Sequence, residues 1–423
     1  MQEIVEIRER AILVGIDWPG SPWPVESSLE ELVRLIDTVG AETIATTTQR
    51  LDSPNPRTFV GSGKAEEIAD MCRAHAADLV VFDDELTPSQ QANLEKIVGR
   101  DVKVIDRTAL ILDIFALHAT TKEGRLQVRL AQNEYLYPRL RGMWAHLASN
   151  RMGGGVGSRF GEGESQLEVD RRMVRKRISS IKRELARLDE IRATQRESRY
   201  KSGLFKVALA GYTNAGKSSL INRLTNADVL SYDKLFATLD ATTRRLKLPE
   251  GREVTITDTI GFIRKLPTTL VESFKSTLDE INSADLILHV VDGSSDELAY
   301  QMETVEEVLH QIGAERIERL LVFNKKDLLE SEDAARRLSE THPDALLVSA
   351  HTGEGIDELV ERIGKVAAAR DSLIDAIVPY NRGDLVALAH RRCHIISETH
   401  EENGTHLLLY APSDCAHMFL EYA

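Results

Sequence analysis

Short apolar runs alternate with helical patterns along the first 150 residues of the chain. The runs have the length and composition of buried strands, and they cover residues 10–15, 42–48, 78–82 and 102–105. Between them, apolar residues spaced three and four apart predict helices over 29–39, 65–75 and 89–98. Strands and helices that alternate in this way form a small parallel sheet covered by helices. We therefore expect an N-terminal α/β domain over residues 1–150.

A longer helical pattern and a glycine-rich run follow these strands. Residues 108–140 are apolar on one side and polar on the other, which predicts one long helix. The run over 150–161 has no core pattern and carries glycines, two arginines and a phenylalanine. It is either a finger that becomes ordered on RNA or an interdomain linker.

Residues 171–201 combine a coiled-coil pattern with positive charge. Apolar residues recur there at alternating steps of four and three, the spacing of a helical seam; they are Val174, Ile178, Ile181, Leu185 and Leu188. The stretch contains twelve Lys or Arg and four Asp or Glu, although the whole chain has a net charge of −14. We expect residues 151–202 to form the finger and a basic helical arm, which is a two-helix hairpin or a coiled coil, although a solvated helix face would give the same charges.

An octapeptide with phosphate-binding character follows the arm. It matches the pattern Gly-x-x-x-x-Gly-Lys-Ser and consists of Gly211, Tyr212, Thr213, Asn214, Ala215, Gly216, Lys217 and Ser218. Because an apolar strand precedes it and a helical pattern follows it, its backbone N–H groups would face a di- or triphosphate. Lys217 would place its charge on the outer phosphates, and the Ser218 hydroxyl would bind Mg²⁺.

Three further motifs lie at the ends of apolar strands, in the order that a GTPase domain requires. They are Asp258, Thr259, Ile260 and Gly261, then Asn324, Lys325, Lys326 and Asp327, and finally Ser349, Ala350 and His351. The Asp327 carboxylate can accept both donors on the N1–H and 2-amino edge of guanine, whereas adenine would leave it unpaired. Ligands of open α/β sheets bind at the carboxyl ends of the strands, so the four motifs together predict GTP binding.

The other motif residues have expected partners on the same ligand. Asp258 would hold a water of the Mg²⁺ shell, and the Gly261 N–H would meet a γ-phosphate. The Ala350 N–H would reach guanine O6. Switch I lies between residues 235 and 244, where one threonine should complete the Mg²⁺ shell. Position alone does not choose among Thr238, Thr242 and Thr243.

Two residues bear on hydrolysis, although the sequence assigns no catalytic residue. Phe262 stands where Ras-like switches carry a glutamine that orients the attacking water. A phenyl ring neither donates nor accepts a hydrogen bond, so we expect slow intrinsic hydrolysis, unless a distant polar residue does that work. Asn214 either ligates a monovalent cation such as K⁺ beside the phosphates or only stabilises the loop. Asn214 and Gly261 are the candidates for transition-state support.

The fold class is thus α/β, with a P-loop GTPase domain over 203–369 built on a mostly parallel sheet with helices on both faces. Residues 370–423 follow a strand, helix and hairpin pattern with a turn at Asn403-Gly404, which predicts a small α+β domain. No apolar run approaches the length of a membrane span, and the chain begins with no signal peptide. We expect a cytoplasmic protein, in part membrane-associated.

The motifs resemble those of one family, the HflX-type ribosome-associated GTPases. The resemblance rests on the octapeptide, on Asp258 to Phe262, and on a switch I stretch formed by Phe236, Ala237, Thr238, Leu239 and Asp240. It extends to residues 105–116, 126–132 and 164–168 and covers roughly 15–369. Ala241 departs from the proline usual in the family, and residues 160–165 depart from its Gly-Pro-Gly-Glu-Thr.

The resemblance implies a function as well as a fold. It implies that Thr238 binds Mg²⁺ together with Ser218. It also implies that the protein binds the large ribosomal subunit and its rRNA, splits or rescues stalled ribosomes as a stress response when loaded with GTP, and is stimulated by ribosomes. Away from the ribosome we expect a monomer.

Two other functions were weighed against this one. A GTPase coupled to RNA modification would need a cofactor site, and the sequence contains neither a cysteine nucleophile nor a dinucleotide fingerprint. A membrane-remodelling GTPase would need spanning or amphipathic basic-aromatic segments, which the sequence also lacks.

Overall fold

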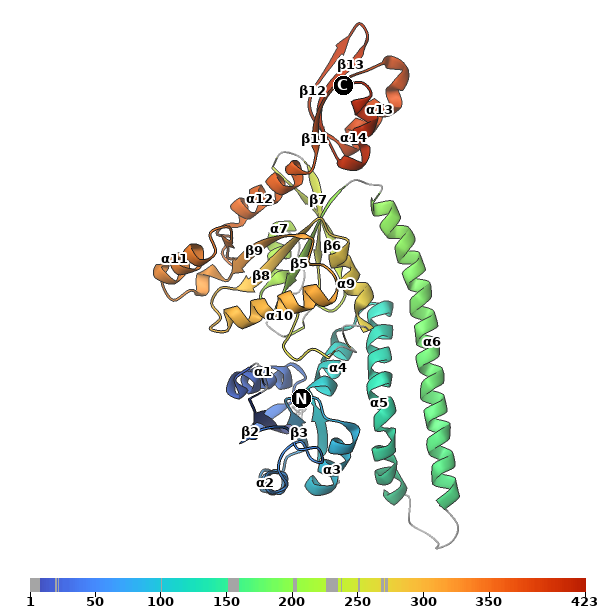
Figure 1. Ribbon diagram of the computed structural model, residues 1–423, viewed down its shortest axis with the longest axis vertical. Helices are drawn as coiled ribbons and strands as arrows, with labels where there is room; N and C mark the ends of the chain where they lie inside the picture. The colour runs from blue at the N-terminus through green and yellow to red at the C-terminus, as the bar shows by residue number, and fades with distance from the viewer. Residues whose placement is uncertain are drawn as a thin grey trace, which may run out of the picture. The chain divides into compact units, whose positions relative to one another are not determined.

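The computed structural model describes residues 8–19, 21, 23–99, 101–150, 160–200, 204–225, 235–236, 238–249, 252–267, 270 and 273–423 (Figure 1). Within these ranges, the side chains of 141–150, 160–167, 192–200, 275–276 and 413–414 are not described. Two α/β sheets and a smaller antiparallel sheet follow one another along the chain. A pair of long helices lies between the first two sheets in the sequence.

The N-terminal sheet is parallel and has the strand order β2-β1-β3-β4. Its elements are β1 (Arg10–Asp17), α1 (Val25–Thr38), β2 (Glu42–Arg50), α2 (Ser62–His75), β3 (Leu79–Phe82), α3 (Pro88–Val98) and β4 (Lys103–Asp106). Alternate residues of the strands, such as Ile12 and Val80, join Ile68 of α2 and Leu94 of α3 in one buried cluster. The strands and helices predicted for this region are therefore present, with ends that differ by a few residues.

The single long helix predicted over 108–140 is wrong, because two helices occupy that stretch. They are α4 (Arg107–His118) and α5 (Lys122–Asn150). The Asp106 carboxylate accepts a hydrogen bond from the Ala109 N–H at 2.9 Å, and Thr121 Oγ1 accepts one from the Gly124 N–H at 2.9 Å. Each side chain satisfies an N–H group that a helix start leaves unpaired, so each fixes a separate start.

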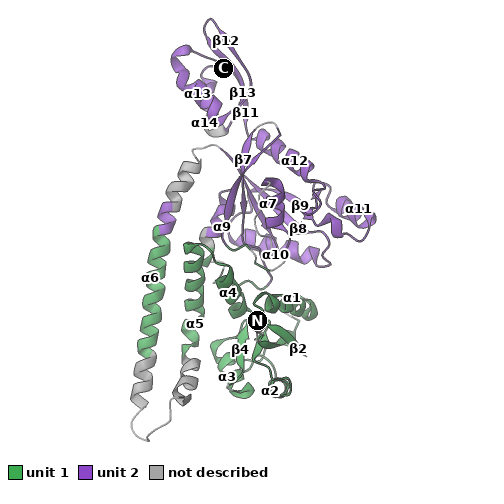
Figure 2. Cartoon of the chain, turned by 180° about the vertical axis from the view of Figure 1, so that it is seen from behind, with its two compact units in different colours: residues 1–187, 234–239, 265–274 green, residues 188–233, 240–264, 275–423 purple. Residues whose placement is uncertain are grey.

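Helix α6 (Phe160–Tyr200) is a single helix of 41 residues that runs beside α5 (Figures 1 and 2). The ammonium of Lys182 lies 2.8 Å from a carboxylate oxygen of Glu134, and that of Lys122 lies 2.5 Å from one of Glu184. Ile181 of the predicted seam is buried. Residues 171–200 are therefore one helix and not a hairpin, and the arm, α6, pairs with α5. Residues 151–159 of the glycine-rich run fall outside the described residues.

The larger sheet has the order β10-β9-β8-β5-β7-β6 and is parallel except for the edge strand β6. Its strands are β5 (Phe205–Gly211), β6 (Thr242–Lys247), β7 (Glu253–Asp258), β8 (Leu286–Asp292), β9 (Glu318–Asn324) and β10 (Leu346–Leu347). Its helices are α7 (Lys217–Thr225), α9 (Lys275–Asn282), α10 (Leu298–Gln311), α11 (Glu332–Thr341) and α12 (Ile356–Ala369). This is the mostly parallel P-loop GTPase sheet that the sequence predicts.

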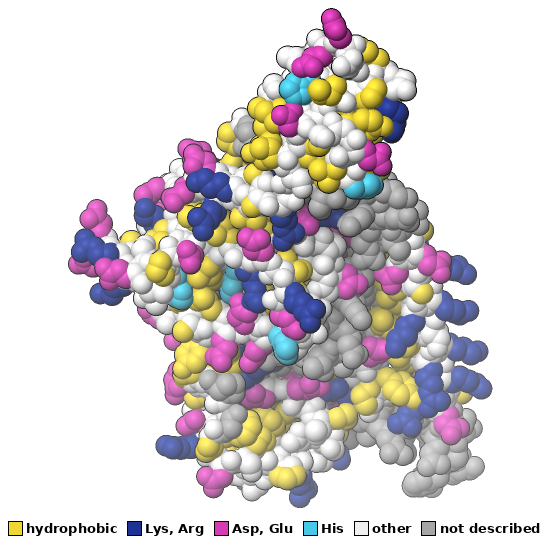
Figure 3. Space-filling view, turned by 45° about the horizontal axis from the view of Figure 1, so that its top comes forward, with side chains coloured by type: hydrophobic (Ala, Val, Ile, Leu, Met, Phe, Trp, Pro, Cys, Tyr) yellow, Lys and Arg dark blue, Asp and Glu magenta, His cyan; other side chains and the backbone are white. Residues whose placement is uncertain are grey.

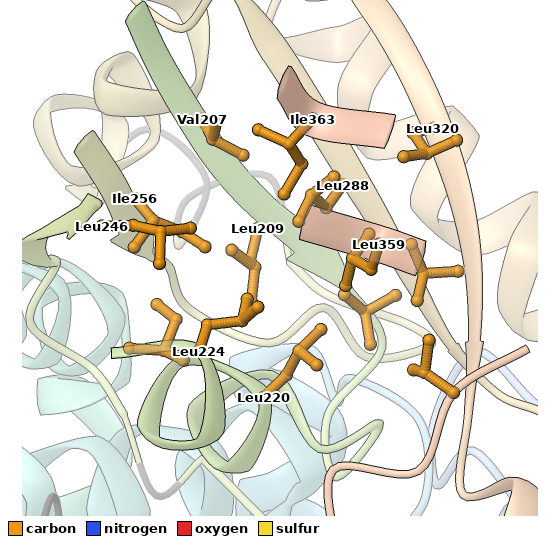
Figure 4. Packing of buried hydrophobic residues seen from close by; sticks show 14 of the residues in the cluster. Val207, Leu209, Leu220, Leu224, Leu246, Ile256, Leu288, Leu320, Leu359 and Ile363 are labelled. Carbon is orange, nitrogen blue, oxygen red and sulfur yellow. The ribbon is translucent and has the colours of Figure 1, made fainter. Parts of the chain in front are cut away.

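One side of this sheet packs on α7 and α12 (Figure 4). Leu209 of β5 and Leu288 of β8 meet Leu220 of α7 and Leu359 of α12, and none of the four is exposed. Burial of apolar side chains at this density holds the strand ends in register. Since the motif residues follow directly on those ends, the core fixes where they emerge.

The last part of the chain is a three-stranded antiparallel sheet in the order β11-β13-β12. It contains β11 (Ser372–Val378), α13 (Gly383–Arg392), β12 (His394–Glu401), β13 (Gly404–Ala411) and α14 (Ser413–Leu420). The predicted strand, helix and hairpin are all present. The final helix α14 adds Cys415 and Phe419 to a separate buried cluster.

The chain forms two compact units, and each unit contains segments that are separate in the sequence (Figure 2). The first unit contains residues 1–187 together with 234–239 and 265–274. The second contains 188–233, 240–264 and 275–423. The described residues of 235–239 in switch I, and those of 265–274, which follow switch II (Asp258 to Phe262), are therefore grouped with the N-terminal domain. The predicted boundaries at residues 150, 202 and 369 stay predictions.

Candidate nucleotide-binding site

The octapeptide forms a tight loop between β5 and α7. Strand β5 ends at Gly211 and α7 begins at Lys217. Asn214 and Gly216 have φ angles of 60° and 87°, in the left-handed region. A Cβ on Gly216 would lie 2.2 Å from Nδ2 of Asn324, so only glycine fits there. The loop thus turns sharply and brings the start of α7 to the carboxyl edge of the sheet, where an anion would meet backbone N–H groups.

Lys217 is held at the mouth of this loop. Its ammonium donates hydrogen bonds to the carbonyl oxygens of Gly211 and Tyr212 at 3.0 and 2.8 Å. Burial lowers the pKa of Lys217 to about 8, against an opposing effect of the Asp258 carboxylate. A buried cation at the start of a helix is poised to pair with phosphate oxygens.

The residues expected to hold Mg²⁺ lie next to each other. The Ser218 hydroxyl donates to Oδ2 of Asp258 at 2.7 Å, which joins α7 to the end of β7. A hydroxyl and a carboxylate are hard oxygen ligands of the kind that Mg²⁺ takes. The donor set therefore fits the metal; Ser218 would be a direct ligand and Asp258 would hold a water of its shell. The next residue, Thr259, donates its hydroxyl to Leu209 O at 2.6 Å and is fully buried, so its side chain supports β5.

The structure separates the three threonines considered for switch I. Thr242 and Thr243 lie in β6, paired with Asp258 and Thr257 of β7. The Thr243 and Thr257 hydroxyl oxygens are 2.9 Å apart, which fixes Thr243 in the strand pairing. Thr238 precedes the strand and lies outside any regular element, and its role as a Mg²⁺ ligand stays a prediction. Ala237 lies outside the described residues.

The neighbours of Thr238 in switch I are buried in the first unit. Phe236, with a φ of 58°, has its ring centroid 4.7 Å from that of Phe115 on α4, edge to face. Phe274 lies on the same Phe115 ring at 5.0 Å. Leu239 is buried as well, whereas Asp240 is partly exposed and belongs to the second unit.

Switch II is hydrogen-bonded to the octapeptide through the backbone of Phe262. The Phe262 N–H donates to Gly211 O at 3.0 Å, and the Thr213 N–H donates to Phe262 O at 2.7 Å. A Cβ on Gly261 would lie 2.8 Å from Cα of Thr213 and 3.0 Å from Nζ of Lys217. The Gly261 backbone therefore lies directly against the phosphate-binding residues. Ile260 and Phe262 are both buried, and Phe262 packs as an interior side chain.

The residues expected to read the base meet at the ends of β9 and β10. Asn324 donates through Nδ2 to Ala215 O at 2.9 Å, and its Oδ1 accepts the Ala350 N–H at 3.0 Å. The Ser349 hydroxyl donates to Oδ1 of Asp327 at 2.5 Å and orients that carboxylate. Because the Ala350 N–H is bonded to Asn324 here, its contact with guanine O6 stays a prediction.

The lysines and histidine of these motifs lie around the base-reading residues. Lys325 has a φ of 62° and its ammonium lies 2.7 Å from Asp292, whereas Lys326 pairs with Glu354 at 2.5 Å. His351 Nδ1 lies 3.8 Å from Asp327. The Lys325 pair ties the base-reading loop to the end of β8.

Sequence reasoning missed an ion-pair cluster in the first unit that involves the segment after switch II. Lys265 lies 2.5 Å from Asp83 and 2.7 Å from Asp84, and Arg107 lies 2.7 Å from Asp83 and also pairs with Glu31. Burial opposes the charge of Asp83, but Arg107 and Lys265 together outweigh it and hold the pKa of Asp83 below its usual value. No local pattern could have found these pairs, because Asp83 and Lys265 are 182 residues apart.

The described residues contain no helix that is long and apolar enough to cross a membrane.

Sequence models of three families match successive parts of the chain. They are described as GTP-binding GTPase N-terminal, over residues 26–116, GTP-binding GTPase Middle Region, over 118–199, and 50S ribosome-binding GTPase, over 206–325.

The chain is also similar to proteins named GTPase HflX. The one from Caldanaerobacter subterraneus is 46% identical over 404 residues, which are 96% of this chain and 91% of that protein. The one from Escherichia coli is 43% identical over 378 residues, 89% of this chain and 88% of that protein. A solved structure described as "crystal structure of SsGBP and GDP complex" is 22% identical, with a TM-score of 0.47, and the match covers 85% of this chain and 99% of that one.

Proposed function

Because the chain belongs to the HflX family of GTPases, we propose that in its GTP form it binds the large ribosomal subunit and separates or rescues stalled ribosomes. GTP hydrolysis would then release the protein. The description 50S ribosome-binding GTPase, given to the family model over 206–325, supports this partner.

The support that carries the proposal is the grouping of residues 235–239 of switch I, and of the segment after switch II, with the N-terminal domain. Phe236 of switch I and Phe274 lie on Phe115 of α4, and Lys265 pairs with Asp83 at the end of β3. Switch segments of GTPases become ordered on the γ-phosphate and Mg²⁺ and are released on hydrolysis. A movement of these segments would therefore act on the N-terminal domain through contacts already formed.

The second support is the charge of the arm. Arg175, Lys176 and Arg177 are exposed on one turn of α6, and dark blue Lys and Arg side chains follow one another along this helix (Figure 3). An exposed row of cations binds the phosphates of RNA by releasing counterions. The arm would thus contact rRNA, while the N-terminal domain reports the nucleotide state.

The hydrolytic step in this proposal uses the residues of the nucleotide site. Ser218 and Thr238 would ligate Mg²⁺, which when bound neutralises charge on the phosphates, and the Gly261 N–H would meet the γ-phosphate. Since Phe262 is buried and apolar, it orients no water, and intrinsic hydrolysis would be slow until the ribosome stimulates it.

Asn214 is proposed to ligate K⁺ beside the phosphates. Its left-handed φ of 60° places it at the tip of the loop. Faster GTP turnover on ribosomes in potassium than in sodium, lost in Asn214→Ala, would support this role. Equal rates in the two salts would leave Asn214 as a residue of the loop scaffold.

Sedimentation of the protein with ribosomes through sucrose gradients tests the proposed function. With a non-hydrolysable GTP analogue, we expect the protein to move with the large subunit and the fraction of intact ribosomes to fall. With GDP, it should stay at the top of the gradient. Association with tRNA instead of ribosomes would favour a GTPase coupled to RNA modification, and an unchanged ribosome profile would contradict the splitting activity.

A further inference from the structure

Arg264 is a buried cation three residues beyond Gly261 that none of the nucleotide motifs includes. It is 1% exposed, which is rare for arginine without a tailored environment. Its backbone N–H donates to the Tyr212 hydroxyl oxygen at 2.9 Å, and its Nε donates to the same oxygen at 3.2 Å. Its terminal nitrogen Nη2 pairs with Glu297, the residue before α10.

These contacts join three parts of the GTPase domain. Tyr212 is the second residue of the octapeptide, and its side chain is 4% exposed. Arg264 lies two residues after Phe262 of switch II, and Glu297 is the residue that precedes α10. A guanidinium presents several donors in a rigid plane, so it can hold a hydroxyl and a carboxylate at the same time. A flexible lysine ammonium could not hold both in the same geometry.

We propose that Arg264 is a positioning residue for GTP hydrolysis, which fixes the start of switch II against the octapeptide through Tyr212 and Glu297. The Gly261 backbone already lies against Thr213 and Lys217. Two backbone hydrogen bonds hold Phe262 to the loop, and the Arg264 contacts hold the chain two residues further on. The Gly261 N–H is thereby kept in place at the phosphates.

The need for such a residue follows from Phe262. Where a glutamine orients the attacking water, its side chain can compensate for small movements of the backbone. Here the stabilisation of the transition state depends on backbone N–H groups, whose position is set only by the fold. A displacement of a fraction of an ångström at Gly261 would lower the rate of hydrolysis without removing a group that binds the nucleotide.

The test compares kcat for GTP hydrolysis and nucleotide affinity in four variants of the full chain, Arg264→Gln, Arg264→Lys, Tyr212→Phe and Glu297→Gln. We expect kcat to fall about tenfold to a hundredfold in Arg264→Gln. The dissociation constant of a fluorescent GTP analogue should change by less than about threefold. Tyr212→Phe removes a single oxygen atom, so it should fold normally and show a loss of the same kind. Arg264→Lys and Glu297→Gln should be intermediate.

A double-mutant cycle decides whether Arg264 acts through Tyr212. Residues that act through each other lose the same interaction, so Tyr212→Phe combined with Arg264→Gln should be no slower than Arg264→Gln alone. The matched control is Arg252→Gln, which breaks the ion pair of Arg252 with Asp371. The two charged groups are 2.7 Å apart, and each of the two side chains is 12% exposed. It should lower Tm and leave kcat unchanged.

Three results would overturn the proposal. The first is a kcat within about twofold of the wild type in both Arg264→Gln and Tyr212→Phe. The second is a double variant whose loss equals the product of the two single losses. The third is a loss confined to nucleotide affinity, which would make Arg264 a residue of the binding loop. Because these measurements use no ribosome, they are independent of the sedimentation experiment.

Discussion

At the scale of single residues, the Asp327 carboxylate is oriented before any base arrives. The Ser349 hydroxyl donates to one of its oxygens at 2.5 Å, and His351 lies 3.8 Å from the other. A carboxylate fixed in this way can accept the two adjacent donors of guanine with little loss of conformational entropy. We therefore predict that the specificity for guanine depends on the Asp327 side chain and its immediate support.

Asp327→Asn should change which base is bound. The amide offers one acceptor and one donor, so it matches xanthine, whose C2 carries an oxygen in place of the amino group. We expect the affinity for GTP to fall by about a hundredfold or more and xanthosine triphosphate to bind better than GTP. Titration calorimetry measures both constants, with the exposed Asp344→Asn as a control. Unchanged GTP affinity in Asp327→Asn would remove Asp327 from the base-binding site.

Lys217 makes nucleotide affinity depend on pH. Burial lowers the pKa of Lys217 to about 8 in the structure described here, and bound phosphates would raise it, because they favour the charged form. Below pH 8 the lysine carries its proton with or without nucleotide, so it contributes no pH dependence. Above pH 8 binding must take up a proton, and the affinity should fall by up to about tenfold per pH unit.

Calorimetry in two buffers of different ionisation enthalpy measures this proton uptake. We expect almost none at about pH 7 and close to one proton at about pH 9. Lys217→Arg, whose guanidinium keeps its charge, should lose the Lys217 contribution and leave only the ionisation of guanine N1. Equal uptake in the two proteins would contradict the assignment to Lys217.

At the scale of elements, the aromatic cluster of Phe115, Phe236 and Phe274 joins α4 to switch I and to the segment that follows switch II. Both partner rings meet Phe115 edge to face, at 4.7 and 5.0 Å, and Phe115 is 1% exposed. Edge-to-face contacts are favourable beyond the area they bury. The left-handed φ of Phe236 is held by this packing, since nothing in a phenyl side chain compensates for it locally.

Phe115→Ala should release switch I as well as destabilise the first unit. We expect a loss of about 3–5 kcal/mol in the free energy of unfolding. GDP release should become faster by at least about threefold, because switch I no longer has a fixed contact surface. Denaturant unfolding and stopped-flow release of a fluorescent GDP measure the two effects.

Phe82→Ala is the matched control for this prediction. Phe82 is equally buried in the first unit, and it meets Phe59 edge to face at 6.0 Å. It should lose similar stability while GDP release stays at the wild-type rate. A similar acceleration in both variants would show that general loosening, and not the Phe115 contact, controls release.

At the scale of the whole molecule, the distribution of charge matters more than its sum. The net charge of −14 would repel RNA, yet α6 carries a basic row. Such a row attracts RNA phosphates at short range, because physiological salt screens the charge of the acidic remainder of the surface within about 8 Å. Binding of the whole protein to ribosomes is therefore expected to weaken steeply as salt rises.

Charge reversal at Arg175, Lys176 and Arg177 should abolish binding to the large subunit and leave nucleotide affinity intact. The plot of log affinity against log salt should become less steep in variants that reverse one of the three charges. Reversal of Arg336 and Arg337, exposed on α11, is the control for a change in net charge alone. Subunit binding that survives the triple reversal would exclude the arm as the rRNA contact.

Much of the fold and the nucleotide site could be predicted because their signals are local. Each strand and helix of the N-terminal domain has its own periodic spacing of apolar residues. The octapeptide carries its glycine, lysine and serine in eight consecutive residues. The split between α4 and α5 was missed because it depends on Thr121, a helix-starting residue in a stretch with a continuous helical period. The choice of Thr238 over Thr242 and Thr243 needed the resemblance to a family, and it stays a prediction; Thr242 and Thr243 both pair with β7.

The sequence by itself determined the phosphate loop and the basic helix, and it predicts oxygen ligands for a metal and a carboxylate for guanine. Each of these needs only neighbouring residues and the backbone geometry they impose. Only the tertiary structure decided which partners the segments around the switches have. In the first unit these partners are Phe115 and Asp83, and the partners of Arg264 are Tyr212 and Glu297. Those partners are brought together by the packing of whole elements, and the pairing of distant residues leaves no period or motif in a single chain.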